Sequence, residues 1–232
     1  MWIIDPSEKR TKLSDRVLPH YSHGEEVFNM VSHIVGGALG IVALVLCIIF
    51  SVLRGRGVGG ILSAVTFGTS MIILYTMSSV YHGLSKNTGK KVLQIMDHCS
   101  IYLLIAGTYT PLLVVSLSAE YPISAWVTFG IIWGLAATII TFNAIDLKKY
   151  ERISMIAYIA MGWAIIVCAP KVYSAIGKGG FLLLLFGGIA YTLGAVLYRM
   201  GVKIPYMHSV FHLFVLTGSI CHVLMIILFV FA

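Results

Sequence analysis

The feature of this sequence that most constrains its fold is a series of apolar stretches, each near or above the length that crosses a lipid bilayer. Of the 232 residues, 59% are hydrophobic and 11% are charged, and the mean hydropathy is +0.94. A transmembrane helix needs about 20 apolar residues. Seven stretches qualify, namely 25–53, 59–84, 92–117, 122–143, 153–169, 181–198 and 205–231. The sequence therefore predicts an all-α, polytopic membrane protein with a bundle of seven transmembrane helices.

The chain divides into two unequal parts. The first residues are polar, so we expect a short cytoplasmic N-terminal segment over residues 1–22 and a transmembrane domain over residues 23–232. Ser22 and Glu25 have capping-box spacing, which predicts that the first helix begins near His23. The four cysteines are scattered through apolar stretches without C-x-x-C spacing, which indicates free thiols.

Three prolines indicate where helices begin or bend. Pro122 and Pro205 suit the first turn of a helix, where the missing N–H is not needed. Pro111 lies inside the third apolar stretch and predicts a kink there.

The positive charges predict the orientation of the bundle, because Lys and Arg accumulate in cytoplasmic loops. With the N-terminus inside, the cytoplasmic set is Lys9, Arg10, Lys12, Arg16, Lys86, Lys90, Lys91, Lys148, Lys149, Arg152, Arg199 and Lys203, and the opposite set is Arg54, Arg56, Lys171 and Lys178. We therefore expect a cytoplasmic N-terminus and an external C-terminus. The net charge of +7 fits attraction to anionic headgroups, and we do not expect nucleic-acid binding.

Four ionisable residues are predicted to lie in one layer at the cytoplasmic end. His82 is near the end of the second helix, and Asp97 lies roughly 8 Å into the third, at 1.5 Å per residue. His208 and His212 lie one and two turns into the last helix from the same side. Ionisable residues inside a membrane are costly and tend to be functional. This layer is therefore the expected functional site.

The residue types and spacing in this layer favour a zinc site. His208 and His212 lie on one helical face, so both imidazoles can reach one ion. With His82 they leave a fourth position open, as in catalytic zinc sites. Asp97 could hold or deprotonate a water, and Ser78, one turn before His82, could orient that water or donate to an oxyanion. The alternatives are a structural His and Asp cluster or a proton relay, and for Ser78 a bond to its own helix backbone.

Other polar residues are expected to play supporting roles. Glu26, Asn29 and His33 form a stripe on the first helix at a similar depth, for which hydrogen bonding between helices is favoured over metal ligation. His98 points to a different helical face from the residue before it, and His222 lies roughly 15 Å deeper in the bundle. Neither belongs to the expected ligand set.

Four motifs carry a resemblance to a known family. They are GEEVFNMVSHIVGG from Gly24, S-x-x-x-H as SSVYH ending at His82, MDHCSIYLLIAGTYTP from Met96, and H-x-x-x-H as HSVFH at 208–212. Together they resemble the hemolysin III branch of the progestin and adipoQ receptor superfamily, which is related to alkaline ceramidases. The resemblance spans nearly the whole chain and implies a seven-helix fold with a cytoplasmic N-terminus.

The resemblance also implies a site and an activity. His82, His208 and His212 would bind zinc, Asp97 would hold the zinc-bound water, and Ser78 would lie nearby. We therefore expect a zinc-dependent hydrolase of an acyl amide or ester of a lipid. The alternative is a non-enzymatic membrane sensor, regulator or pore-forming, haemolytic protein with a structural zinc. A cavity reaching the fourth zinc position would favour the enzyme.

The expected partners are zinc and membrane lipids, while the sequence indicates neither a protein partner nor the particular substrate. The short N-terminal segment lacks the long soluble extension of the eukaryotic receptors, so hormone binding is not expected. We expect a bacterial protein resident in the inner membrane.

Overall fold

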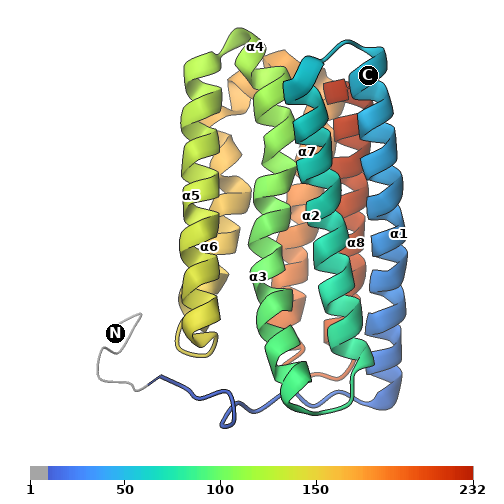
Figure 1. Ribbon diagram of the computed structural model, residues 1–232, viewed down its shortest axis with the longest axis vertical. Coiled ribbons are helices and arrows are strands. Elements are labelled where there is room, and N and C mark those ends of the chain that lie inside the picture. The colour runs from blue at the N-terminus through green and yellow to red at the C-terminus, as the bar shows by residue number, and fades with distance from the viewer. Residues whose placement is uncertain (1–9, 232) are drawn as a thin grey trace.

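The computed structural model describes residues 10–231, and all regular secondary structure in this range is helical. Lys9, one of the predicted cytoplasmic charges, and the start of the predicted N-terminal segment lie outside the described residues. The elements are α1 (His23–Leu53), α2 (Gly57–Gly83), α3 (Thr88–Pro111), η1 (Leu112–Leu117), α4 (Ser118–Glu120), α5 (Pro122–Asp146), α6 (Glu151–Trp163), η2 (Ala164–Cys168), α7 (Ala169–Met200), α8 (Met207–Met225) and η3 (Ile226–Phe231). The long helices run along one common direction (Figure 1).

Six helical stretches within residues 10–231 are long and apolar enough to cross a membrane. They are His23–Leu53, Gly57–Gly83, Thr88–Glu120, Pro122–Asp146, Glu151–Met200 and Met207–Phe231. The prediction of a polytopic helical membrane protein is confirmed. The count differs from the predicted seven because Glu151–Met200, at 50 residues, covers two predicted stretches.

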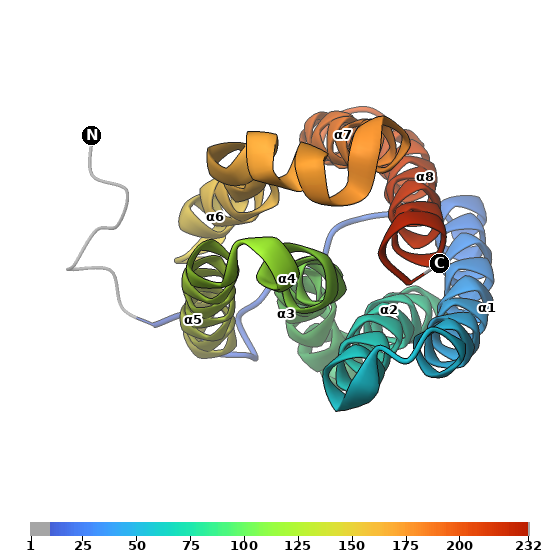
Figure 2. The same cartoon turned by 90° about the horizontal axis from the view of Figure 1, so that it is seen from above.

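The Glu151–Met200 stretch is not one straight helix. It consists of α6, the 3₁₀ segment η2 and α7, and α7 contains a break at Gly177, where φ is 66° and ψ is 177°. Only glycine adopts this backbone conformation readily. At 1.5 Å per residue, a straight helix of this length would measure about 75 Å, more than twice the hydrocarbon thickness of a bilayer. α6 and α7 occupy different positions around the ring of helices (Figure 2).

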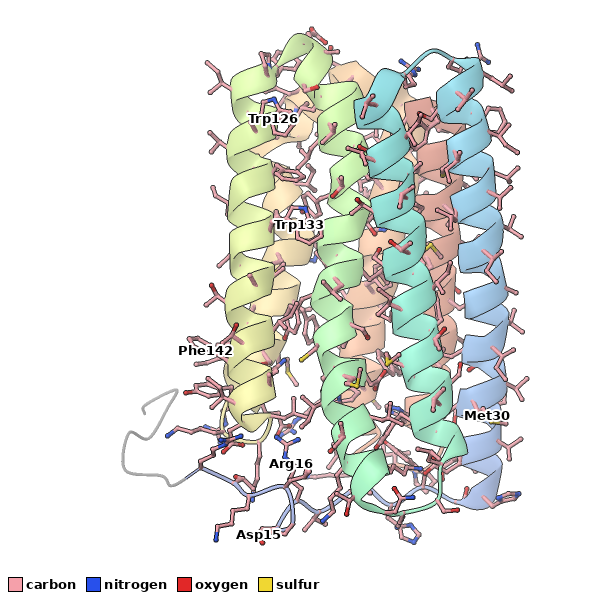
Figure 3. The ribbon with its side chains drawn as sticks, in the orientation of Figure 1. Asp15, Arg16, Met30, Trp126, Trp133 and Phe142 are labelled. Atoms are coloured by element: carbon pink, nitrogen blue, oxygen red, sulfur yellow. The ribbon has the colours of Figure 1, made fainter. Side chains whose placement is uncertain are left out.

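The outer faces of the helices are apolar. On α5, the side chains of Ile123, Val127, Ile131 and Leu135 follow one another at every fourth position and are 81%, 56%, 54% and 42% exposed. The inner face of the same helix carries Trp133, whose indole Nε1 donates to Thr110 Oγ1 at 3.2 Å (Figure 3). An exposed apolar stripe at this spacing is expected where a helix faces lipid.

Helix ends follow the sequence signals at some positions and depart from them at others. The capping box is confirmed, because the Ser22 side chain accepts from the Glu25 backbone N–H and the Glu25 carboxylate accepts from the Ser22 N–H. Pro122 lies in the first turn of α5, as predicted. At Pro111 the α-helix ends and continues as the π-helix η1. Pro111 has no N–H to donate to a helix carbonyl, and the hydrogen bonding changes from α-type to π-type directly after it.

The prediction for Pro205 is wrong. α8 begins at Met207, and Pro205 lies in the preceding turn. The residue between them, Tyr206, adopts a left-handed conformation with φ of 62°, and its backbone N–H donates to Glu25 Oε1 at 2.7 Å. This contact with the start of α1 fixes the turn outside the helix.

Residues 10–22, which we call the strap, run beneath the bundle before α1 begins (Figures 1 and 2). The Thr11 N–H donates to Asp146 Oδ2 at 2.6 Å, and the Arg16 guanidinium lies 4.0 Å from Asp146 Oδ1. Arg16 reaches the lower end of the bundle (Figure 3), where burial lowers the pKa of its guanidinium and the Asp146 carboxylate opposes that shift. The end of α5 thus holds the strap in place.

Candidate metal centre

Three histidines from two helices meet at the lower end of the bundle. His82 lies in the last turn of α2, and His208 and His212 lie in the first two turns of α8. Their side chains are buried, and each offers a ring nitrogen such that the three nitrogens lie within 4.8 Å of one another. These residues form a cluster that could hold a metal ion.

The spacing of His208 and His212 is compatible with two ligands of one zinc ion. His208 Nε2 and His212 Nε2 are 3.1 Å apart. Two ligands of a tetrahedral zinc, each at about 2.0–2.1 Å from the ion, are separated by roughly 3.3 Å. His82 Nε2 is buried and has no hydrogen-bond partner among the described residues. A buried polar atom without a partner requires an explanation, and a bound cation supplies one.

His82 is oriented by a carboxylate from α1. Its Nδ1 lies 2.7 Å from Glu26 Oε2, and Glu26 Oε1 in turn accepts a hydrogen bond from Lys90 Nζ at 2.6 Å. The sequence favoured hydrogen bonding for Glu26 without identifying its partners. The sequence signal for this contact is that Glu26 and His82 are predicted to lie at the same depth.

The rest of the α1 stripe packs against the centre. The His33 ring stacks on the His212 ring with centroids 3.7 Å apart and meets Tyr75 edge-on. Asn29 is fully buried one turn earlier. Among residues 10–231, the side chains of Asn29 and His33 have no hydrogen-bond partner, and His33 is not in the group of three candidate ligands, so the expected hydrogen bonding between helices is seen at Glu26 and not at these two residues.

Asp97 and Ser78 lie beside the histidines. Ser78, one turn before His82 on α2, is buried and lies near the Asp97 carboxylate from α3, and both side chains line the same cavity. The Asp97 side chain is 19% exposed, and it is not part of the group of three candidate ligands. This arrangement leaves the carboxylate adjacent to the cluster and open to the cavity that it lines.

The two histidines excluded by the sequence lie apart from the cluster. The His98 ring contacts the Gln94 carbonyl at 2.8 Å and the Tyr198 hydroxyl at 3.2 Å. His222, deeper in α8, contacts the Leu184 carbonyl at 3.2 Å. Both rings are therefore engaged by other groups.

A cavity of about 490 Å³ extends from this site into the bundle. His208, His212, Ser78 and Asp97 line it, whereas His82 is not among its lining residues. Most of its wall comes from α3, α6 and α7 and is apolar, with Ile101, Ile105, Ile159, Leu184 and Leu185 among the lining side chains.

The strap contributes to the same cavity. Asp15, Arg16, Val17 and Pro19 line it, and so does Tyr21, whose ring stacks on His208 with centroids 4.8 Å apart. Burial raises the pKa of the Tyr21 hydroxyl well above its usual range, so this ring is neutral beside the histidines. The strap therefore forms part of the wall of the cavity beside the histidines.

Comparison with known proteins places the chain in a family. The family model described as haemolysin-III related matches residues 21–223. This chain belongs to that family. The matched residues contain the three histidines together with Ser78 and Asp97. The resemblance drawn from the motifs is confirmed.

Individual haemolysin-III relatives match most of the chain. Hemolysin-3 of Bacillus cereus is 37% identical over 213 residues, which cover 92% of each chain. The hemolysin-3 homolog of Bacillus subtilis (strain 168) is 39% identical over 195 residues, or 84% of this chain and 89% of the relative. The monocyte to macrophage differentiation factor of Homo sapiens is 29% identical over 168 residues, or 69% and 67%. This last similarity supports the wider progestin and adipoQ receptor superfamily.

Proposed function

We propose that this protein binds zinc through His82, His208 and His212 and hydrolyses an amide or ester bond of a membrane lipid. The observation that carries the proposal is the cavity, because it joins the candidate ligands His208 and His212, the carboxylate of Asp97 and an apolar interior. A closed cluster with four protein ligands would instead favour a structural metal. Within the described residues, the candidate group has three ligands.

The chemistry that zinc supplies when bound is Lewis-acid activation of a carbonyl and of a water molecule. Asp97 accepts a proton from the attacking water as the water oxygen adds to the carbonyl carbon. When the C–N or C–O bond breaks, Asp97 returns that proton to the leaving amine or alkoxide. Water is the only co-reactant, and the proton taken from it is returned to the leaving group, so atoms and charge balance.

Ser78 has two roles in this scheme. Its hydroxyl lies near Asp97, and a hydrogen bond donated to the carboxylate would hold Asp97 in place before proton transfer. Once Asp97 is protonated, it attracts the hydroxyl less strongly than the charged carboxylate does. The Ser78 hydroxyl then donates to the oxyanion of the tetrahedral intermediate.

The cavity supports a lipid substrate. Its volume of about 490 Å³ lies within the range of small-molecule binding pockets, and its wall is mainly apolar. A scissile bond beside Asp97 would leave an acyl chain to occupy the space between α3, α6 and α7.

We further propose seven membrane crossings, with the N-terminus in the cytoplasm of a bacterium. The cluster supports this count, because His82 at the end of α2 and His208 at the start of α8 must lie at the same membrane face. Between His82 and His208 the chain must therefore cross the membrane an even number of times. α3 and α5 provide two crossings, so the Glu151–Met200 stretch must provide two more. The Bacillus relatives support residence in a bacterial cytoplasmic membrane.

The decisive experiment compares the wild-type protein with Asp97→Asn. The substitution leaves the three histidines in place, so the variant should retain zinc. Wild-type protein incubated with lipid extracts should release fatty acid, and the variant should be slower by roughly 10² to 10⁴, the contribution of a general base. Mass spectrometry of released fatty acid and elemental analysis of zinc provide the two measurements.

The outcomes separate enzyme from sensor. Wild type that releases nothing from a broad panel of amide and ester lipids would exclude the hydrolase. If Asp97→Asn also abolished a cellular effect of the same protein, the carboxylate would have a conformational or proton-coupled role in a membrane sensor or channel.

A further inference from the structure

The hydrogen bonds of Glu26 join three helices at the candidate metal centre. Glu26 is on the first turn of α1, His82 on the last turn of α2, and Lys90 on the first turn of α3. The two oxygens of one carboxylate serve different partners, Oε1 for Lys90 and Oε2 for His82.

Lys90 fixes the orientation of the carboxylate. Its side chain is 3% exposed, and a lysine that is almost fully buried needs a negatively charged partner. Its Nζ donates to Glu26 at 2.6 Å and to the Leu84 carbonyl at 2.9 Å, while its backbone N–H donates to the Asn87 side chain that caps α3. Because Lys90 is anchored at both ends, Glu26 Oε1 has a defined position and Oε2 faces His82.

The contact at Oε2 determines which nitrogen of His82 is available. A carboxylate only accepts hydrogen bonds, so Nδ1 must carry the proton and donate it to Glu26. Nε2 then carries the lone pair. It is this nitrogen that is buried without a partner among residues 10–231, next to His208 and His212.

We infer that Glu26 is a positioning residue of the metal centre, which holds His82 in the tautomer and ring orientation that direct Nε2 at the ion. Carboxylates that accept the second N–H of a ligating histidine also raise its basicity, and their loss lowers metal affinity by about 10- to 100-fold. This inference rests on the zinc site of the proposed function. It assigns Glu26 no contact with the ion or the substrate.

The test measures zinc affinity of the purified full-length protein by competition with a chelating dye, with Zn²⁺ as the only added ligand. Glu26→Leu should bind zinc about 10- to 100-fold more weakly than wild type. Glu26→Gln should lose less, because its amide oxygen can still accept from Nδ1. The absorption spectrum of the Co²⁺-substituted protein should change in Glu26→Leu, since it reports ligand number and geometry.

Lys90→Gln is the matched control. It removes the ammonium that pairs with Oε1 but keeps the Glu26 carboxylate that accepts from His82, so its loss of zinc affinity should be smaller than that of Glu26→Leu. Thermal unfolding of each variant reports the structural contribution of the network. The two variants could instead lose zinc affinity equally and in proportion to their losses of stability. That result would show that Glu26 acts only by linking the helices, and it would overturn the inference.

The remaining outcomes are also decisive. Wild-type affinity in a folded Glu26→Leu overturns the inference and leaves the zinc site intact. If Glu26→Leu does not fold, Glu26→Asp replaces it, because the shorter carboxylate keeps its charge and cannot reach His82; unchanged affinity in that variant again overturns the inference. A wild-type protein that binds no zinc overturns both the inference and the proposed function.

Discussion

Burial alone does not distinguish the histidines that could bind metal from those that do not. His33, His82, His208, His212 and His222 are all buried. What separates His222 from the cluster is the direction of its ring nitrogens. His222 turns Nε2 to a backbone carbonyl, whereas His208 and His212 turn Nε2 toward each other.

We predict that purified protein carries about one zinc per chain and that the double variant His208→Ala, His212→Ala loses it, because one remaining imidazole cannot replace three ligands. Elemental analysis of protein purified without added metal measures this. His222→Ala removes a buried histidine from the same helix and should leave the zinc content unchanged. Equal zinc in the double variant and wild type would exclude this site.

Residue-scale prediction succeeded where a contact depends on helical periodicity. The spacing of His208 and His212 follows from one helix, and helix depth brought His82 and Asp97 to the same layer. The link from Glu26 to His82 could not be predicted in the same way. It depends on how α1 is rotated relative to α2, which follows from the packing of the two helices along their length and not from the periodicity of either one.

At the scale of elements, polar contacts tie the strap to the end of α5. Asp146 at the end of α5 accepts from the backbone N–H groups of Thr11, Lys148 and Lys149, and it lies against Arg16. One carboxylate therefore closes the end of α5 and retains the segment that lines the cavity.

Asp146→Asn should loosen the strap. The amide keeps an acceptor oxygen but leaves the buried Arg16 without a counter-charge, which should cost about 1–3 kcal/mol. Hydrogen exchange over residues 10–22 should become faster, and the unfolding temperature should fall. Glu151→Gln is the control, since its pair with Arg199 is exposed and contributes at most about 1 kcal/mol. An unchanged exchange rate in Asp146→Asn would show that other contacts hold the strap.

Element boundaries were predicted best where a cap or a proline acts locally. Ser22 with Glu25 and Pro122 located the starts of α1 and α5. The predicted stretches left a connection over 170–180, where lysines and glycines interrupt the apolar pattern. The structure instead has helix from Ala169, with the break confined to Gly177. Helical hydrogen bonds continue through polar residues when the chain remains packed against neighbours. Hydropathy reports only how apolar the residues are, so it does not predict a helix there.

For the whole molecule, the charge distribution supports the proposed orientation, and the metal cluster supports the proposed number of crossings. The described chain begins at one end of the bundle and finishes at the opposite end (Figure 1). The end that carries the strap and the histidine cluster is also the end to which the loops rich in Lys and Arg belong. A cytoplasmic site would therefore receive its water from the cytoplasm and its lipid from the bilayer.

Reporter fusions test this topology directly. Reporters placed after Lys86 and Lys149 should report the cytoplasm, because both loops belong to the positively charged side, and reporters after Arg56 and at the C-terminus should report the outside. The C-terminal reporter decides between six and seven crossings, since a single crossing by Glu151–Met200 would return the C-terminus to the cytoplasm. That result would also place the start of α8 at the face opposite the end of α2. His82 and His208 could then not approach as they do here, so a cytoplasmic C-terminus would overturn the metal centre together with the seven-crossing topology.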